Sequence, residues 1–191
     1  PRSSSAASDV YKRQHEKKIK KHKKVSHYSY GRYGSSTTIE LENMLKELEQ
    51  AFHVFLTGTG FGGVALAIMS LCRPGDEFLV SDNVYGPTKE ISEKLLKEFD
   101  VKAKFYNPDS FDDLKNKVTD KTKMILVENP GSNTFEFQDL SKIVNLAKKK
   151  KIYTFLDNTW GTPLYLKPLK LGFDMSFSCL LYTSDAADEE R

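Results

Sequence analysis

The chain has 191 residues, 39% hydrophobic and 29% charged, which is enough for one folded domain with a buried core. No stretch approaches the roughly 20 apolar residues of a membrane-spanning helix, and no secretory signal pattern opens the sequence, so we expect a cytoplasmic protein without a membrane partner. Cys72 and Cys179 stand apart, which argues against a disulfide framework or a zinc site. The net charge of +3 comes largely from the lysine-rich run 17–24, predicted as a solvated arm rather than a nucleic-acid-binding element.

Both ends of the chain differ from its middle. Residues 1–14 are rich in serine and alanine without periodicity, and residues 180–191 interrupt a strand pattern without turn residues. Both stretches are typical of translated adapter sequence joined to a gene fragment, so we expect a non-native extension over 1–14 and a non-native tail over 179–191. Genuine terminal segments are the alternative.

Between these ends, strand and helix patterns alternate. The spacing predicts a helix over 39–49 with Thr37 or Thr38 as its cap, a short strand over 54–57 and a small-residue helix over 62–71. Further strands are predicted at 78–81, 104–106, 124–128, 152–157 and 175–178, and further helices at 88–99, 109–118 and 139–150. This alternation predicts an α/β fold, with a mostly parallel sheet and helices on both faces.

A glycine turn, residues 58–63 (Gly-Thr-Gly-Phe-Gly-Gly), lies between a predicted strand and a predicted helix. Free amides at a helix start can bind an anion. Gly58, Gly60 and Gly63 also satisfy G-x-G-x-x-G, and Asp82 ends the next strand where a dinucleotide-binding fold carries its ribose-binding acid. The turn alone leaves a single phosphate, a dinucleotide and a purely structural role open.

Asp157 ends a predicted strand, and open α/β sheets bind ligands beyond the strand ends. Beside a protonated pyridine nitrogen, this carboxylate would hold the positive charge that makes the ring an electron sink. Tyr85 could stack on such a ring, and Arg32 could clamp a phosphate. Each residue alone has an ordinary structural explanation, as a turn former or a surface residue. Their combination favours a phosphate-bearing aromatic cofactor.

Residues 30–178 resemble the cysteine and methionine metabolism (trans-sulfuration) family of pyridoxal phosphate enzymes. Four landmarks occur in the family's order: Tyr-Gly-Arg-Tyr-Gly at 30–34, the glycine turn, Asn-Val-Tyr-Gly at 83–86 and Asp-Asn-Thr at 157–159. Residues 128–132 and 157–160 are most similar to the bacterial β-eliminating cystathionine lyases. Relatives that act at the γ carbon more often carry asparagine where Ser132 stands.

The resemblance implies an incomplete large domain of the aspartate aminotransferase-like type that binds pyridoxal 5′-phosphate. Residues 15–45 would form an amino-terminal arm and first helix, and residues 46–178 the truncated cofactor domain. The implied cofactor contacts are the Gly60 and Phe61 amides with the phosphate, Tyr85 on the ring, Asp157 with the ring nitrogen, Ser132 near the ring hydroxyl, and Tyr30 and Arg32 with the phosphate of a neighbouring subunit. The active site would then belong to a dimer, assembled in the full-length parent as a dimer of dimers.

One departure from the family is severe. The family's Schiff-base lysine follows a Ser-x-Thr-Lys pattern ten residues beyond the glycine that matches Gly172, and that position is Tyr182 here, with Cys179 and Leu181 before it. The resemblance therefore implies a chain that lacks this lysine, along with the domain that grips the substrate carboxylate. We expect such a fragment to be inactive.

For the parent protein, the resemblance implies a carbon–sulfur lyase of methionine biosynthesis that converts cystathionine to homocysteine, pyruvate and ammonia by β-elimination. It leaves γ-lyase, γ-synthase and sulfhydrylase chemistry open. Two other interpretations of the residues remain: an NAD(P)-binding Rossmann-type dehydrogenase, in which Asp82 approaches the glycine turn and Asp157 lies far from it, and a non-catalytic α/β binding module.

Overall fold

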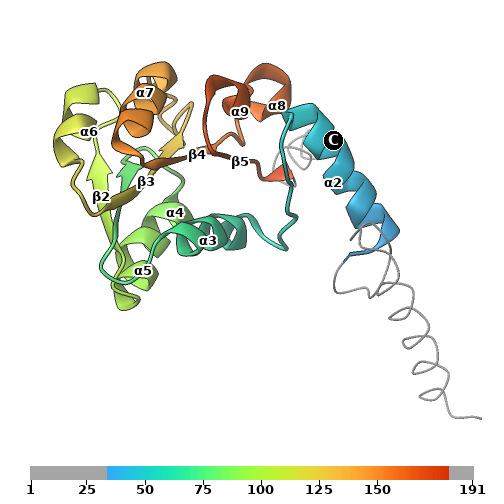
Figure 1. Cartoon of the computed structure of the whole chain (residues 1–191), viewed down its shortest axis with the longest axis horizontal. Helices are drawn as coiled ribbons and strands as arrows, with labels where there is room; N and C mark the ends of the chain where they lie inside the picture. Colours follow the sequence, from blue (N-terminus) through green and yellow to red (C-terminus); the bar gives the residue numbers. More distant parts are fainter. Residues whose placement is uncertain (1–33, 181–191) are drawn as a thin grey trace, which may run out of the picture. The chain divides into compact units, whose positions relative to one another are not determined.

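A computed structural model of the chain describes residues 34–180 (Figure 1). The chain divides into two compact units, one comprising most of α2 (Ser36–Glu49) and residues 52–56, the other comprising the sheet and its helices. None of the helices in the described stretch is long and apolar enough to cross a membrane.

Helix α2 begins after Ser35, whose hydroxyl accepts a hydrogen bond from the Thr38 amide at 3.2 Å. The Ser35 amide donates in return to the Thr38 hydroxyl at 2.7 Å. This reciprocal pair satisfies amides that the first helical turn leaves free. The cap is therefore Ser35, and the prediction of Thr37 or Thr38 was wrong because only the residue before the helix can reach its free amides.

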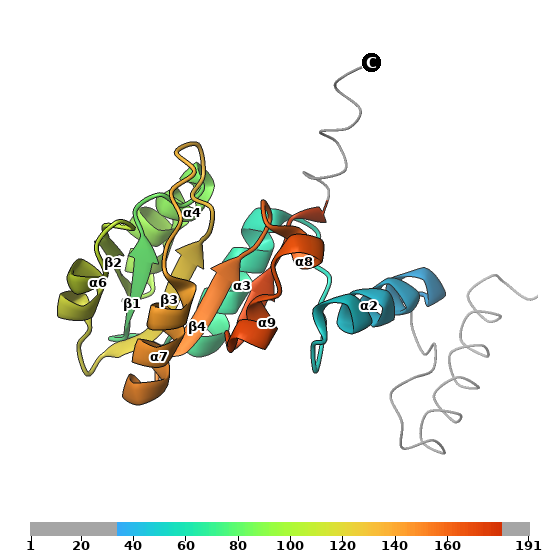
Figure 2. The same ribbon diagram turned by 90° about the horizontal axis from the view of Figure 1, so that it is seen from above.

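The second unit is built on five parallel strands in the order β2-β1-β3-β4-β5. Figure 2 labels the first four of these in order, and Figure 1 labels β5 beside β4. The strands are β1 (Glu77–Ser81), β2 (Lys102–Tyr106), β3 (Thr122–Glu128), β4 (Tyr153–Asp157) and β5 (Met175–Phe177). The order reverses between β1 and β3, and the region beyond such a reversal is where open α/β sheets bind ligands. In the β3–β4 pairing, Glu128 lies opposite Asp157.

Helices cover both faces of this sheet (Figure 1). One face carries α3 (Gly60–Leu71) and a segmented helix made of α4 (Gly86–Glu90), η2 (Ile91–Leu95) and α5 (Leu96–Glu98), and the other carries α6 (Phe111–Lys117) and α7 (Leu140–Lys150). Phe78 and Val80 of β1 are buried in one core, whereas Leu79 between them is buried in the other. This alternation is the expected result of a strand buried on both sides.

The predicted α/β class and five of the six predicted strands are confirmed. Residues 54–57 form no strand, because no described strand supplies backbone hydrogen bonds to them. The predicted helix over 88–99 begins two residues earlier, at Gly86, and is broken into three pieces. Two short helices between β4 and β5, α8 (Thr162–Tyr165) and α9 (Pro168–Leu171), were not predicted.

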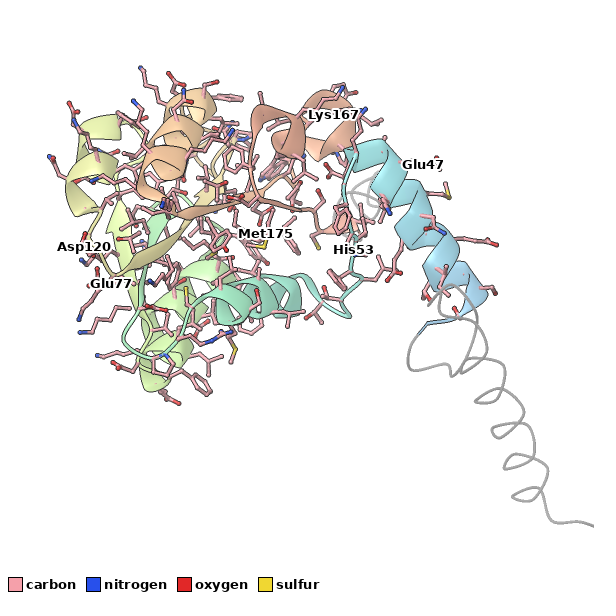
Figure 3. All side chains as sticks on the ribbon, in the orientation of Figure 1. Glu47, His53, Glu77, Asp120, Lys167 and Met175 are labelled. Carbon is pink, nitrogen blue, oxygen red and sulfur yellow. The ribbon has the colours of Figure 1, made fainter. Side chains whose placement is uncertain are left out.

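Charged residues gather where β1 and β3 begin, as Figure 3 shows for Glu77 and Asp120. Glu77 accepts hydrogen bonds from Lys104 at 2.7 Å and from the Thr119 hydroxyl at 2.6 Å, and these bonds lower its pKa. Glu77 is therefore satisfied by its neighbours. Among the described residues, three of the four buried side-chain atoms without a hydrogen-bond partner belong instead to residues just after strand ends, Asn83, Asn158 and Ser178.

Candidate functional site

Asp157 is the last residue of β4, and only 7% of it is exposed. Its Oδ1 accepts hydrogen bonds from the Thr159 amide at 3.1 Å and the Thr159 hydroxyl at 2.7 Å. Burial raises the pKa of Asp157, and the two bonds from Thr159 act in the opposite direction. Within residues 34–180 no lysine, arginine or histidine forms an ion pair with it. The site thus contains a buried acid without a counter-charge.

Glu128 is the last residue of β3, and 3% of it is exposed. Its Oε2 accepts a hydrogen bond from the Tyr85 amide at 2.6 Å. The pKa of Glu128 is raised to about 8, first by burial and then by the charge of Asp157, while hydrogen bonds from Tyr85 and Ser132 lower it. Burial and the neighbouring charge therefore favour the protonated form of Glu128. Glu128 and Asp157 are hereafter called the acid pair.

The glycine turn leads directly into α3. Thr59 caps this helix, because its hydroxyl accepts from the Gly62 amide at 3.0 Å and its carbonyl accepts from the Gly63 amide at 3.1 Å. The amides of Gly60 and Phe61 make no hydrogen bond to any residue of the described part. Two adjacent N–H groups at the start of a 12-residue helix are thus available to an anion.

Thr159 and the residues after β5 connect Asp157 to this turn. The Thr159 hydroxyl that donates to Asp157 also accepts from the Cys179 amide at 3.0 Å. A Cβ added at Gly60 would lie 3.2 Å from Cys179 Sγ, and one added at Gly63 would lie 2.7 Å from the Phe177 ring. The buried acid and the free amides therefore lie at the same end of the sheet.

Tyr85 and Ser132 border the acid pair. Tyr85 precedes α4 and is 51% exposed, whereas Ser132 is buried and donates its amide to the Asn83 carbonyl at 2.8 Å. Asp157 thus lies at the same sheet end as Gly60 and Phe61. It is paired with Glu128, which contacts Tyr85 and Ser132. The other predicted contacts, Tyr30 and Arg32, lie outside the described residues, as does Tyr182.

The dinucleotide interpretation of the glycine turn is wrong. No strand leads into the turn, and a Cβ at Gly58 would meet nothing within 4 Å, so the first glycine of the pattern is not required there. Asp82 instead forms an exposed ion pair with Lys89 at 2.5 Å. A dinucleotide site would bring Asp82 to the turn and leave Asp157 far from it. Here the acid connected to the turn is Asp157.

Two cavities, of about 220 and 400 Å³, lie beside β2, and both are bordered by Tyr106 and Pro108. None of the candidate cofactor residues borders either cavity. Among the described side chains, no group of three or more His, Cys, Asp and Glu residues could hold a metal ion.

Sequence reasoning assigned no role to Glu128 or Thr159. A signal for Glu128 was present, because Glu128 and Asp157 each close a predicted strand and neighbouring parallel strands bring such ends together. Thr159 follows Asp157 by two residues, the spacing of an acid that bonds to the backbone ahead of it. Its second bond, to Cys179, depends on tertiary structure and has no sequence signal.

These features agree with comparisons to known proteins. The family model described as Cys/Met metabolism PLP-dependent enzyme matches residues 3–181. A Saccharomyces cerevisiae protein provisionally named a cystathionine beta-lyase is 40% identical over 147 residues, covering 77% of this chain and 43% of that protein. The cystathionine beta-lyase of Bordetella avium is 35% identical over 148 residues, 78% of this chain and 37% of its own length.

Other relatives carry different names. An L-alanine/L-glutamate racemase of Wolbachia pipientis is 34% identical, and a cystathionine gamma-lyase of Bacillus subtilis is 30% identical. The crystal structure of a Campylobacter jejuni protein, provisionally described as an O-acetylhomoserine (thiol)-lyase, contains a pyridoxyl-lysine monophosphate and matches with a TM-score of 0.76 and 30% identity. The match covers 80% of this chain and 38% of that one. This chain spans about two fifths of the length of the relatives that it matches.

Proposed function

Because this chain belongs to the Cys/Met metabolism family of PLP-dependent enzymes, we propose that it binds pyridoxal 5′-phosphate between the glycine turn and Asp157. The whole protein would be a carbon–sulfur lyase that cleaves cystathionine to homocysteine, pyruvate and ammonia. One observation carries the proposal: a buried carboxylate without a counter-charge lies at the same end of the sheet as a pair of free helix amides, beside the last residues of β5.

This donor set fits the cofactor at both of its charged ends. The Gly60 and Phe61 amides suit a phosphate, and the Asp157 carboxylate suits a protonated pyridine nitrogen. When bound, the cofactor supplies an electron sink for negative charge at the substrate's α carbon. Asp157 would keep the proton on the ring nitrogen, and Thr159 would hold the carboxylate in one orientation through its two hydrogen bonds.

The remaining assigned residues complete this proposal. Tyr85 would cover one face of the ring, and Ser132 would lie near its hydroxyl. Tyr30 and Arg32 would bind the phosphate in the neighbouring subunit of a homodimer. Two such dimers would form a tetramer, located in the cytoplasm. Position 182 holds tyrosine where the family carries its lysine, so we expect this chain to bind the cofactor without turning over substrate.

Support for β-elimination over related chemistry comes from the motifs at 128–132 and 157–160 and from two relatives named cystathionine beta-lyase. With the full-length protein, the test compares homocysteine and pyruvate released from cystathionine with the products formed from O-acetylhomoserine and from L-alanine. Pyruvate formed from cystathionine is the expected result. Preferential racemisation of alanine, or thiol exchange on O-acetylhomoserine, would replace the lyase assignment.

Cofactor binding is tested with pyridoxamine 5′-phosphate, an amine that cannot condense with surface lysines. Equilibrium dialysis should give saturable binding to the wild type and at least tenfold weaker binding to Asp157→Asn, which keeps the shape of the side chain but loses its charge. The matched control is Asp82→Asn, because Asp82 also follows a strand but pairs with Lys89 at the surface. Equal affinity in all three proteins would refute the role of Asp157.

A further inference from the structure

We propose that Glu128 is a positioning residue, whose buried carboxyl group holds the backbone of Tyr85 in place and thereby fixes the Tyr85 ring at the site. The contact between that ring and a cofactor rests on the proposed function. The backbone restraint itself does not, because it is a property of the cofactor-free chain.

The main evidence is the hydrogen bond that the Tyr85 amide donates to Glu128 Oε2 at 2.6 Å. The two residues are 43 positions apart in the sequence. Tyr85 is the residue before α4, and its side chain makes no capping bond that could hold the turn. Its ring is half exposed, so packing does little to restrain it. Its carbonyl accepts the first bond of α4 from the Lys89 amide at 3.1 Å, and the carboxyl group of Glu128 anchors its amide.

A second set of contacts holds the loop that follows Glu128 against the turn that contains Tyr85. The Ser132 amide donates to the Asn83 carbonyl at 2.8 Å, and the Gly131 amide donates to the Glu136 carbonyl at 3.0 Å. The Asn83 side chain occupies the space where a Cβ of Gly131 would stand, and its amide nitrogen lies 3.3 Å from Glu136 Oε2. The loop after β3 thus approaches the Tyr85 turn closely, with Glu128 at its base.

The charge environment explains how a carboxyl group can be retained at this position. The groups facing it are Asp157 on β4, the Tyr85 amide on the turn and Ser132 on its own loop. Burial and the Asp157 charge favour the protonated form of Glu128, which spares the site a second buried negative charge. The neutral carboxyl still accepts from Tyr85, which a neutral glutamine can also do.

Hydrogen exchange in the cofactor-free full chain tests the restraint directly. We expect slow exchange of the Tyr85 amide in the wild type, at least tenfold faster exchange in Glu128→Ala, and near-wild-type exchange in Glu128→Gln, which keeps an acceptor oxygen. The matched control is Glu136→Gln, an acid in the same loop that contacts Asn83 instead of Tyr85. Leu126 in the middle of β3 is the internal reference, and its amide must remain protected for a variant to be scored as folded.

Binding of pyridoxamine 5′-phosphate provides the second readout. Glu128→Ala should weaken binding about tenfold, and Glu128→Gln should restore it. Unchanged Tyr85 exchange in Glu128→Ala, or equally fast exchange in Glu128→Gln, would overturn the inference. Fast Tyr85 exchange with unchanged cofactor affinity would also overturn it, because the anchor would then fix nothing at the site. If the wild type binds no cofactor, the proposed function fails, and the exchange comparison alone decides the role of Glu128.

Discussion

Thr159 joins two parts of the candidate site with one hydroxyl group. It donates to Asp157 and accepts from the Cys179 amide, so its loss would affect the acid and the segment beside the glycine turn together. Valine has the same shape but can neither donate nor accept. This makes Thr159 the residue at which the two ends of the proposed ligand are coupled.

We expect Thr159→Val to raise the pKa of Asp157 further and to destabilise the chain by about 1–3 kcal/mol, because the buried carboxylate loses a donor. Chemical denaturation and the pH dependence of pyridoxamine 5′-phosphate binding measure the two effects. Thr159→Ser, which keeps the hydroxyl, serves as the control. Wild-type behaviour of the valine variant in both assays would contradict the coupling.

Glycine is required at Gly131 and not at Gly58. A Cβ at Gly131 would lie 2.0 Å from Asn83 Nδ2 and 2.9 Å from Asn83 Cβ, whereas a Cβ at Gly58 would meet nothing within 4 Å. We expect Gly131→Ala to cost about 1–3 kcal/mol of unfolding free energy and Gly58→Ala to be nearly neutral. Urea unfolding of both variants checks the difference, and equal stabilities would contradict the close approach of Asn83.

At the level of elements, the first amides of α3 divide into two groups: some are hydrogen-bonded and stabilise the helix, and others are left free for a ligand. Thr59 satisfies the Gly62 and Gly63 amides and leaves those of Gly60 and Phe61 free. The helix end is therefore capped only in part, and the two amides that are not capped are those proposed to bind the phosphate.

Thr59→Ala should destabilise the chain by roughly 1 kcal/mol through the lost cap. A matched substitution is Ser110→Ala, which removes the same kind of cap from α6, far from the glycine turn in sequence. Both variants should unfold at lower urea concentration, but only Thr59→Ala should weaken binding of inorganic phosphate, which NMR titration can follow. Equal phosphate affinity in the two variants would exclude the start of α3 as an anion site.

Burial patterns explain which elements were predictable from sequence. Strands β1 and β3 are mostly apolar runs between polar turns, and β1 is buried at every position. Residues 54–57 have similar local character but lack a partner strand, which local sequence cannot reveal. The short helices α8 and α9 each span four residues with a proline near the start, too little for a periodic signal.

The residues of the candidate site also divide into those with a local sequence signal and those that depend on tertiary contacts. Asp157, Tyr85 and the glycine turn could be predicted because strand ends and glycine-rich helix starts are local features. Glu128 and Thr159 act through bonds to residues 43 and 20 positions away, and such contacts exist only once the sheet is assembled.

For the molecule as a whole, the acid pair makes stability depend on pH. The pKa of Glu128 is about 8 in the folded chain and has an ordinary value of 4.5. Between these values the folded chain binds more protons than the unfolded chain, so stability falls as pH rises from 4.5 to 8 and levels off above 8.

Glu128→Gln cannot titrate at this position and should lose this part of the pH dependence. We expect the variant to gain stability over the wild type as pH rises from 5 to 8.5, by an amount on the order of a few kcal/mol. Urea unfolding at both pH values measures the gain. A constant difference across the range would mean that Glu128 ionises normally in the folded chain.

The two outermost described strands, β2 and β5, differ in the charged side chains that they carry. Strand β2 carries Lys102 and Lys104, charges that discourage pairing with another chain, whereas β5 reads Met-Ser-Phe and has no described strand on its outer side. Backbone groups along β5 can therefore template intermolecular pairing, and we expect this chain to self-associate with rising concentration. Sedimentation velocity should detect the association, and Ser176→Lys should suppress it by placing a charge on that edge.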